Sequence, residues 1–188
     1  YMLGRITGDP VYADRCEELI LNHFPASQTP EYKGLHYLTA SNCPQLDNSP
    51  AHDFWNEKKK GFPQLPFSPY HVFRCCQHNV AMGWPWYVQN LWLATADDGI
   101  AAWLYAPSTL TARVGREGQA VTVSTDTAYP FGDTVELNMA MNEPTEFPLY
   151  LRIPRWCTEF AVSVNDVSAD ISPTPSAFLR ICREWTDG

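Results

Sequence analysis

The hydrophobic pattern of this chain changes near residue 96, and that change constrains the fold more than any other feature. Upstream, apolar residues recur at helical spacing in two segments, which a long proline-rich stretch separates. From Gly99 onward, apolar and polar residues alternate in short runs. A period of about 3.6 residues indicates helices, whereas a period of two indicates half-buried strands. We therefore predict an α+β chain, with helices and a long loop in residues 1–96 and an incomplete antiparallel β-sandwich in residues 97–188.

Two helices joined by a tight turn are predicted at the start of the chain. The first ends near Thr7, and the second runs from Pro10 to about His23. Gly8 suits the position after a helix end, and Asp9 can cap the next helix. Such a helical hairpin is the building unit of bundles and α/α barrels. The charged residues expected on the solvent side of the second helix are Asp14, Arg15, Glu17 and Glu18.

Residues 25–74 are expected to be mostly irregular, because prolines interrupt them repeatedly. A segment this long with little regular structure is usually functional or disordered, and its many aromatic side chains argue against disorder. It could line a pocket for a sugar or another polar ligand. A structural loop whose aromatic side chains fill gaps is the alternative.

A largely buried, tryptophan-rich helix is predicted from Pro85 to about Thr95, followed by a turn at residues 97–99. In the run from Phe147 to Ile153, Tyr150 and Arg152 are expected to point outward, because they alternate with aliphatic residues. The predicted strands are Ile100–Tyr105, Thr109–Val114, Gln119–Thr125, Thr134–Met141, Phe147–Ile153, Phe160–Val164 and Ala177–Arg183.

Charge and cysteine content narrow the class of protein. The net charge of -8 argues against nucleic acid and anionic membranes as partners, since both attract clustered Lys and Arg. No stretch approaches the roughly 20 apolar residues that span a bilayer. Six irregularly placed cysteines do not resemble a disulfide scaffold, and the compartment and any homo-oligomeric assembly stay open. Both ends resemble interrupted elements, so we expect a piece of a longer polypeptide.

The densest group of reactive side chains surrounds Cys75 and Cys76, with Arg74 before them and His78 after them. Both thiols could be buried packing residues, or they could form a vicinal disulfide. They could also bind a metal or supply a nucleophile, because a nearby cation favours the reactive thiolate. Zinc sites use about four ligands, so co-ligands would be needed. The candidates in the sequence are His36, Cys43 and His78.

The run Cys75-Cys76-x-x-Asn79, and the segments that follow it, resemble the β-L-arabinofuranosidase-like glycoside hydrolases of family 127 and relatives. These proteins carry a Cys-Cys-x-x-Asn motif, a helix, and then a strand introduced by Asp-Gly. The likeness covers nearly the whole chain in order. The other matching segments are Thr7–Asp14, Gly83–Pro85, Leu91–Thr95, Asp98–Pro107 and Leu149–Cys157.

The resemblance implies a multi-domain fragment, with the C-terminal hairpin and last helix of an (α/α)6 barrel followed by the sandwich. It implies that Cys75 is the nucleophile of a retaining hydrolase acting on β-L-arabinofuranosyl or related plant-glycan linkages. It also implies that Cys75 and Cys76 bind zinc, together with a Glu-x-Cys motif. That motif and the general-acid glutamate are expected outside this chain, which alone should be inactive.

The resemblance also indicates candidate substrate contacts. Tyr37 and His36 fall where relatives present a tyrosine to the sugar, so both are candidate substrate-binding residues. His78 replaces a small residue or proline of the family motif and could contact substrate or pack behind the site. The alternative function is a non-catalytic carbohydrate-binding or structural sandwich with a helical appendage and buried cysteines.

Overall fold

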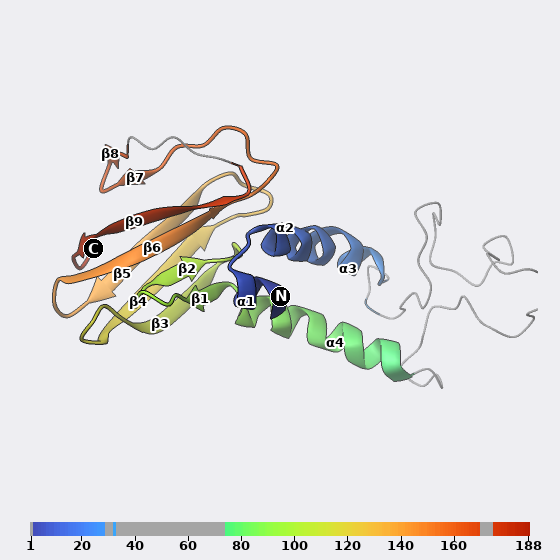
Figure 1. The fold of residues 1–188 in the computed structure, drawn as a ribbon. Coiled ribbons are helices and arrows are strands. Elements are labelled where there is room, and N and C mark those ends of the chain that lie inside the picture. The colour runs from blue at the N-terminus through green and yellow to red at the C-terminus, as the bar shows by residue number, and fades with distance from the viewer. Residues whose placement is uncertain (1, 29–31, 33–73, 170–174) are drawn as a thin grey trace, which may run out of the picture. The chain divides into compact units, whose positions relative to one another are not determined.

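The computed structural model describes residues 2–28, 32, 74–169 and 175–188, and for residues 74–77 it describes the backbone alone. These residues belong to two compact units, Tyr1–Glu17 with Tyr87–Gly188, and Glu18–Trp86. The first unit holds every strand that is described (Figure 1). The predicted domain boundary near residue 96 stays a prediction, and packing places residues 1–17 with the strands.

Helices α1 (Met2–Thr7) and α2 (Val11–Glu18) meet at the predicted turn. Gly8 has a φ of 68°, in the left-handed region that favours glycine, and its N–H donates to the carbonyl of Gly4 at 2.8 Å. The Asp9 Oδ1 atom accepts a hydrogen bond from the Val11 N–H at 3.0 Å. Glycine thus ends the first helix and aspartate caps the second, which confirms the predicted turn.

Helix α4 (Arg74–Gln89) begins earlier than predicted and contains the cysteine pair in its first turn. Pro85 was predicted to start a helix, but it lies inside α4, where it offers no N–H to the carbonyl of Ala81. Trp84 and Trp86 are exposed, so the expectation of a largely buried helix is wrong for them. None of the described helices is long and apolar enough to cross a membrane.

The end of α2 continues without a break into a wider helix and then a short one. These are the π-helix η1 (Leu19–His23) and α3 (Phe24–Ala26). The ring of Phe24 packs edge-on against that of Trp84, with centroids 5.5 Å apart. A Cβ atom on Gly83 would collide with the same phenyl ring. Glycine at this position therefore allows α3 and α4 to approach closely.

The prediction that a helix continues to Thr95 is wrong, because Trp92–Ala94 forms strand β1. A short apolar run cannot be assigned to helix or strand by periodicity alone, which explains the error. Strand β1 pairs antiparallel with β2 (Ile100–Ala102). Asp98, with a φ of 60°, lies in the turn between them.

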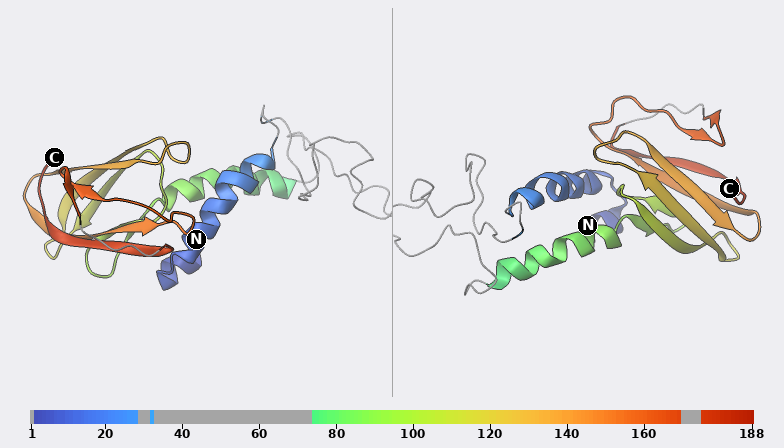
Figure 2. Two further views of the ribbon diagram at one scale, coloured as in Figure 1. Left: turned by 90° about the horizontal axis from the view of Figure 1, so that it is seen from above. Right: turned by 180° about the vertical axis from the view of Figure 1, so that it is seen from behind.

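Strands form at nearly all the predicted places and build three sheets (Figures 1 and 2). The orders are β1-β2-β6-β9, β3-β4-β5 and β7-β8. The further strands are β3 (Ser108–Val114), β4 (Gln119–Thr127), β5 (Val135–Met141), β6 (Thr145–Ile153), β7 (Ser163–Val164), β8 (Val167–Ser168) and β9 (Ala177–Trp185).

One strand pair departs from the antiparallel arrangement that the alternating pattern suggested. Strands β2 and β6 run parallel, with Ile100 opposite Leu149. A parallel pair requires a crossover connection, and here the whole β3-β4-β5 sheet lies in the chain between the two strands. The mixed α+β organisation is confirmed, with antiparallel pairing elsewhere in the described sheets.

The two larger sheets share one hydrophobic core. Its members come from both sheets, as expected for sheets that pack face to face. Phe147 of β6 and Trp185 of β9 lie against each other, with ring centroids 5.9 Å apart. The buried members are Ile100, Val114, Val121, Val123, Met139, Phe147, Leu149 and Trp185.

Candidate functional site

The residues predicted to do chemistry lie at or beyond the edge of the described structure. Cys75 and Cys76 occupy the first turn of α4, and their side chains lie outside the described part. His78 follows on the same helix and is exposed. His36 and Tyr37 lie outside the described residues. The catalytic, metal-binding and substrate-binding roles of these residues therefore stay predictions.

The donor chemistry of the cysteine pair fits part of a zinc site. Thiolate sulfur is a common zinc ligand, and structural zinc sites use about four ligands. Two adjacent cysteines can supply at most half of such a set. Among the side chains that the structure describes, no group of three or more His, Cys, Asp or Glu residues could hold a metal ion. Any further ligands would lie outside those side chains.

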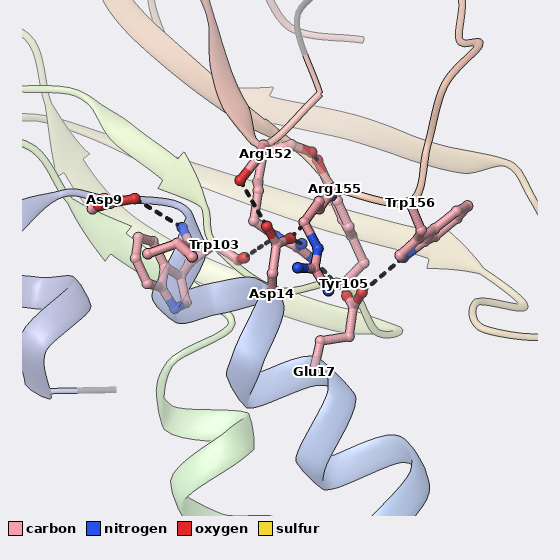
Figure 3. Close-up of polar contacts among 10 residues, drawn as sticks. Asp9, Asp14, Glu17, Trp103, Tyr105, Arg152, Arg155 and Trp156 are labelled. Carbon is pink, nitrogen blue, oxygen red and sulfur yellow. Dashed lines mark hydrogen bonds and ion pairs between the residues drawn. The ribbon is translucent and has the colours of Figure 1, made fainter.

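The most elaborate polar arrangement in the described residues surrounds Arg152 of β6 (Figure 3). Its side chain is fully buried, and two carboxylates of α2 that are 5% exposed flank it. Arg152 Nη1 donates to Asp14 Oδ1 at 2.7 Å, and Nη2 donates to Glu17 Oε2. The Nε atom donates to the carbonyl of Trp103 at 2.7 Å. The guanidinium therefore uses all three of its nitrogens to bind fixed partners. We call Arg152, Asp14 and Glu17 the Arg152 cluster.

Both carboxylates have further partners on the sandwich side. Asp14 accepts hydrogen bonds from the Ser176 hydroxyl at 2.8 Å and from the Arg155 backbone N–H at 3.2 Å. Glu17 Oε1 accepts one from the Trp156 indole N–H at 3.1 Å. Burying charges is costly unless they are paired and hydrogen-bonded, and this cluster meets both conditions.

Three tyrosines border the cluster and depend on its charges. Burial raises the pKa of Tyr87 to about 12, and the negative charge of Glu17 adds to the effect. Burial, followed in size by the Glu17 charge, also raises the pKa of Tyr129, which hydrogen-bonds to this carboxylate. Burial likewise raises the pKa of Tyr105. Around neutral pH these hydroxyl groups are therefore protonated and can act as donors.

Arg152 itself stays charged in this environment. Burial disfavours its positive charge, but the attraction of Glu17, together with Tyr105 and Asp14, leaves its pKa above the usual value. The cluster is thus a pair of carboxylates around a permanent cation. Each charge is bonded within the cluster or to neighbouring backbone and side chains. It links α2 to β6 and has the properties of a structural connection.

The sequence pattern did not predict this cluster. Asp14 and Glu17 were expected on the solvent side of the helix and Arg152 on the outer face of its strand, and all three expectations are wrong. The sequence did contain a signal for a buried carboxylate, because Glu17 lies at helical spacing from Ala13 and Ile20. All three residues are buried in the structure. A carboxylate on an apolar helix face requires a cation from another element.

Two family models match the chain, and both describe domains of the same family. Residues 1–89 match the β-L-arabinofuranosidase GH127 catalytic domain. Residues 99–188 match the β-L-arabinofuranosidase GH127 middle domain. The chain belongs to glycoside hydrolase family 127. In GH127 terms, the cluster joins two domains, since Asp14 and Glu17 lie in the catalytic-domain match and Arg152 in the middle-domain match.

Solved structures agree with the GH127 assignment. A GH127 β-L-arabinofuranosidase from Geobacillus stearothermophilus T6 is 25% identical, with a TM-score of 0.76, and the match covers 99% of this chain and 28% of that one. A structure described as a glycoside hydrolase is 22% identical, with a TM-score of 0.74, and the match covers 99% and 29%. A GH127 β-arabinofuranosidase is 20% identical, with a TM-score of 0.70, and the match covers 99% and 28%.

At 22% and 20% identity, the second and third of these structures show a similar fold and nothing more. The chain spans less than a third of the length of each of these structures. No curated protein sequence matches it.

Proposed function

We propose that the protein containing this chain is a retaining glycoside hydrolase that cleaves β-L-arabinofuranosyl or related plant-glycan linkages, with Cys75 as the nucleophile. The observation that carries the proposal is the run Cys75-Cys76-x-x-Asn79 in the first turns of α4, within the residues that match the GH127 catalytic domain. The Geobacillus structure, 25% identical, is named a β-L-arabinofuranosidase, and this supports the substrate class.

The proposed reaction has two displacements at the anomeric carbon. First, the Cys75 thiolate forms a bond to that carbon while the glycosidic C–O bond breaks, and a general acid gives its proton to the leaving oxygen. Water then forms a bond to the same carbon and gives a proton to the conjugate base, while Cys75 leaves as thiolate. Two inversions give net retention. The proposed general acid is a glutamate outside this chain, as the resemblance implies.

The position of Cys75 supports a role that needs a thiolate. A helix N-terminus presents free backbone N–H groups, which favour a negative charge by about 0.3–1 kcal/mol when it lies in the first turn. Cys75 is the second residue of α4, a helix of 16 residues. Because the thiolate is the nucleophilic form of cysteine, this location favours the reactive species.

Zinc is the proposed cofactor, with Cys75 and Cys76 as two of its ligands. When bound, the ion would keep coordinating thiols deprotonated at neutral pH. The proposal rests on the donor chemistry of the pair and on the resemblance, which implies that a Glu-x-Cys motif completes the set. His36, Tyr37 and His78 are the proposed substrate contacts, since aromatic and imidazole side chains pack against and hydrogen-bond to sugars.

The test compares three cysteine variants in the complete protein. Cys75→Ala should abolish hydrolysis of a nitrophenyl β-L-arabinofuranoside, and Cys76→Ser should lower both zinc content and activity. Cys157→Ala is the matched control, because this free cysteine lies in the middle-domain match. Wild-type activity in Cys75→Ala would refute the proposed nucleophile. A protein that binds arabinofuranosides but hydrolyses none would instead support the carbohydrate-binding alternative.

A further inference from the structure

We propose that Arg152 is a positioning residue for the reaction, because it fixes two catalytic-domain helices onto the middle domain. The inference rests on the proposed function, and it concerns a side chain that is buried and does not meet the substrate. Arg152 does this by two routes. One is its pair of bonds to α2, and the other passes through Tyr105 to the last turn of α4.

The first route fixes the orientation of α2 on the middle domain. An arginine guanidinium is planar and donates in a fixed fork, unlike the single flexible ammonium of lysine. Here the fork divides between Asp14 and Glu17, which are one helical turn apart on α2. Two bonds from one rigid group define a direction, so α2 can neither turn about its axis nor slide without breaking one of them.

The second route reaches α4, the helix that begins with the cysteine pair. The backbone carbonyl of Arg152 accepts a hydrogen bond from the Tyr105 hydroxyl at 2.6 Å. The Arg152 guanidinium lies over the Tyr105 ring, 5.6 Å from its centroid. The carbonyl of Tyr105 accepts in turn from the Tyr87 hydroxyl at 3.0 Å. Tyr87 belongs to the last turn of α4, so both helices are tied to one point of the sandwich.

The hydrogen bond from Tyr87 to Tyr105 holds α4 next to a position where the helix lacks a backbone hydrogen bond. Pro85 removes one backbone hydrogen bond from the turn just before it. A second contact with the middle domain lies directly after the helix. There the N–H groups of Trp103 and Leu104 both donate to the carbonyl of Leu91, at 2.8 Å and 3.1 Å. Because Pro85 lies two residues before Tyr87 in the same helix, we expect loss of the Tyr87 hydrogen bond to loosen the turns of α4 on the N-terminal side of Pro85.

This arrangement is better explained by precise placement than by stability. A buried ion pair contributes little net stability compared with well-packed apolar side chains of similar volume. Catalysis, by contrast, is sensitive to small displacements, since a nucleophile misplaced by about 1 Å can slow a reaction by about 100-fold. A fully bonded arginine of β6 that joins α2 directly, and α4 through Tyr105 and Tyr87, meets that demand.

The test uses the complete protein and the variants Tyr87→Phe and Arg152→Lys. Tyr87→Phe keeps the ring and removes only the hydroxyl that reaches Tyr105. We expect kcat to fall about tenfold while KM stays within about twofold, as for a displaced nucleophile that still binds substrate. Amide hydrogen exchange in residues 78–86 should also become faster than in the wild type.

We expect the kcat of Arg152→Lys to lie between that of the wild type and the lower kcat of Arg152→Met. Lysine keeps the positive charge but lacks the planar fork of donors. Arg180→Met is the matched control, since this arginine of β9 also pairs with an aspartate, Asp97, but is half exposed. It should leave kcat unchanged. If Arg152→Met does not fold, Arg152→Lys tests the side chain of Arg152 and Tyr87→Phe tests the route through Tyr105.

The inference would be overturned if Tyr87→Phe and Arg152→Lys both fold and both keep the kcat and the amide exchange of the wild type. The proposed function fails on a different result, namely full activity in Cys75→Ala, so the two failures can be told apart.

Discussion

Arg152 and Glu17 form an ion pair shielded from water although they lie 135 positions apart in the sequence. One belongs to the residues that match the GH127 middle domain and the other to those that match the catalytic domain. The sandwich therefore does more than follow the helices along the chain. It provides the cation that allows two carboxylates of α2 to be buried.

The first prediction concerns the cost of breaking this pair. Glu17→Gln removes one charge at constant size and leaves Arg152 with a buried, partly uncompensated charge. We expect a loss of about 3–5 kcal/mol in the free energy of unfolding, measured by urea denaturation. Asp97→Asn is the control, because Asp97 and Arg180 are both well exposed and such pairs contribute about 0–1 kcal/mol. Equal losses in both variants would contradict the account.

The second prediction concerns the contact between α1 and the sandwich. A Cβ atom on Gly4 would collide with the indole ring of Trp103, which is almost fully buried. Gly4→Ala should therefore lower stability by about 1–3 kcal/mol through overpacking, although alanine is the better helix former. Ile6→Ala, on the same helix but 78% exposed, should change stability little. A Gly4→Ala melting temperature at or above that of the wild type would show that α1 does not pack in this way.

The third prediction concerns the shared core of the two larger sheets. Phe147→Ala should cost about 3–5 kcal/mol, because it leaves a cavity among side chains that cannot fully close it. Phe131→Ala offers the matched comparison, since this phenylalanine is 98% exposed. Its unfolding midpoint should equal that of the wild type. Comparable destabilisation of the two variants would argue against the packing of these sheets around Phe147.

The fourth prediction concerns alkaline pH. The pKa of Tyr87 is about 12 in the folded protein, above the ordinary tyrosine value of about 10. This raised pKa contributes stability that is fully present below about pH 10 and is lost as the pH rises toward 12, because the unfolded chain then ionises first. Unfolding free energies measured between pH 9 and pH 12 should fall less steeply for Tyr87→Phe than for the wild type. Parallel curves would contradict the burial of this hydroxyl.

Features with strong local causes could be predicted from the sequence. Gly8 and Asp9 set the turn between α1 and α2 through backbone freedom and capping, which depend on neighbouring residues alone. The connection between β3 and β4 has an equally local cause, since Gly115 and Gly118 both lie at positive φ. Strands β3 to β6 lie where the alternating pattern placed them, because one face of each contributes to the core.

Features that depend on distant partners could not be predicted. Arg152 alternates with aliphatic residues as an outward-facing residue would, and only the approach of α2 turns that position into a buried one. The parallel pairing of β2 with β6 is likewise decided by tertiary packing. The start of α4 was missed because Pro85 usually marks a first helical turn, and here the helix continues through it. The candidate site was located through the resemblance and the Cys-Cys-x-x-Asn motif, whereas the Arg152 cluster required the structure.

The most direct test of a Cys75-dependent glycosidase is to trap the sugar on the protein. The complete protein would be mixed with a β-L-arabinofuranoside that has a good leaving group, quenched with acid in the first turnovers, and digested for mass spectrometry of its peptides. We expect one arabinofuranosyl group bound to the sulfur of Cys75, and no adduct in Cys75→Ala. A glycosyl group on a carboxylate, or steady hydrolysis by Cys75→Ala, would contradict it.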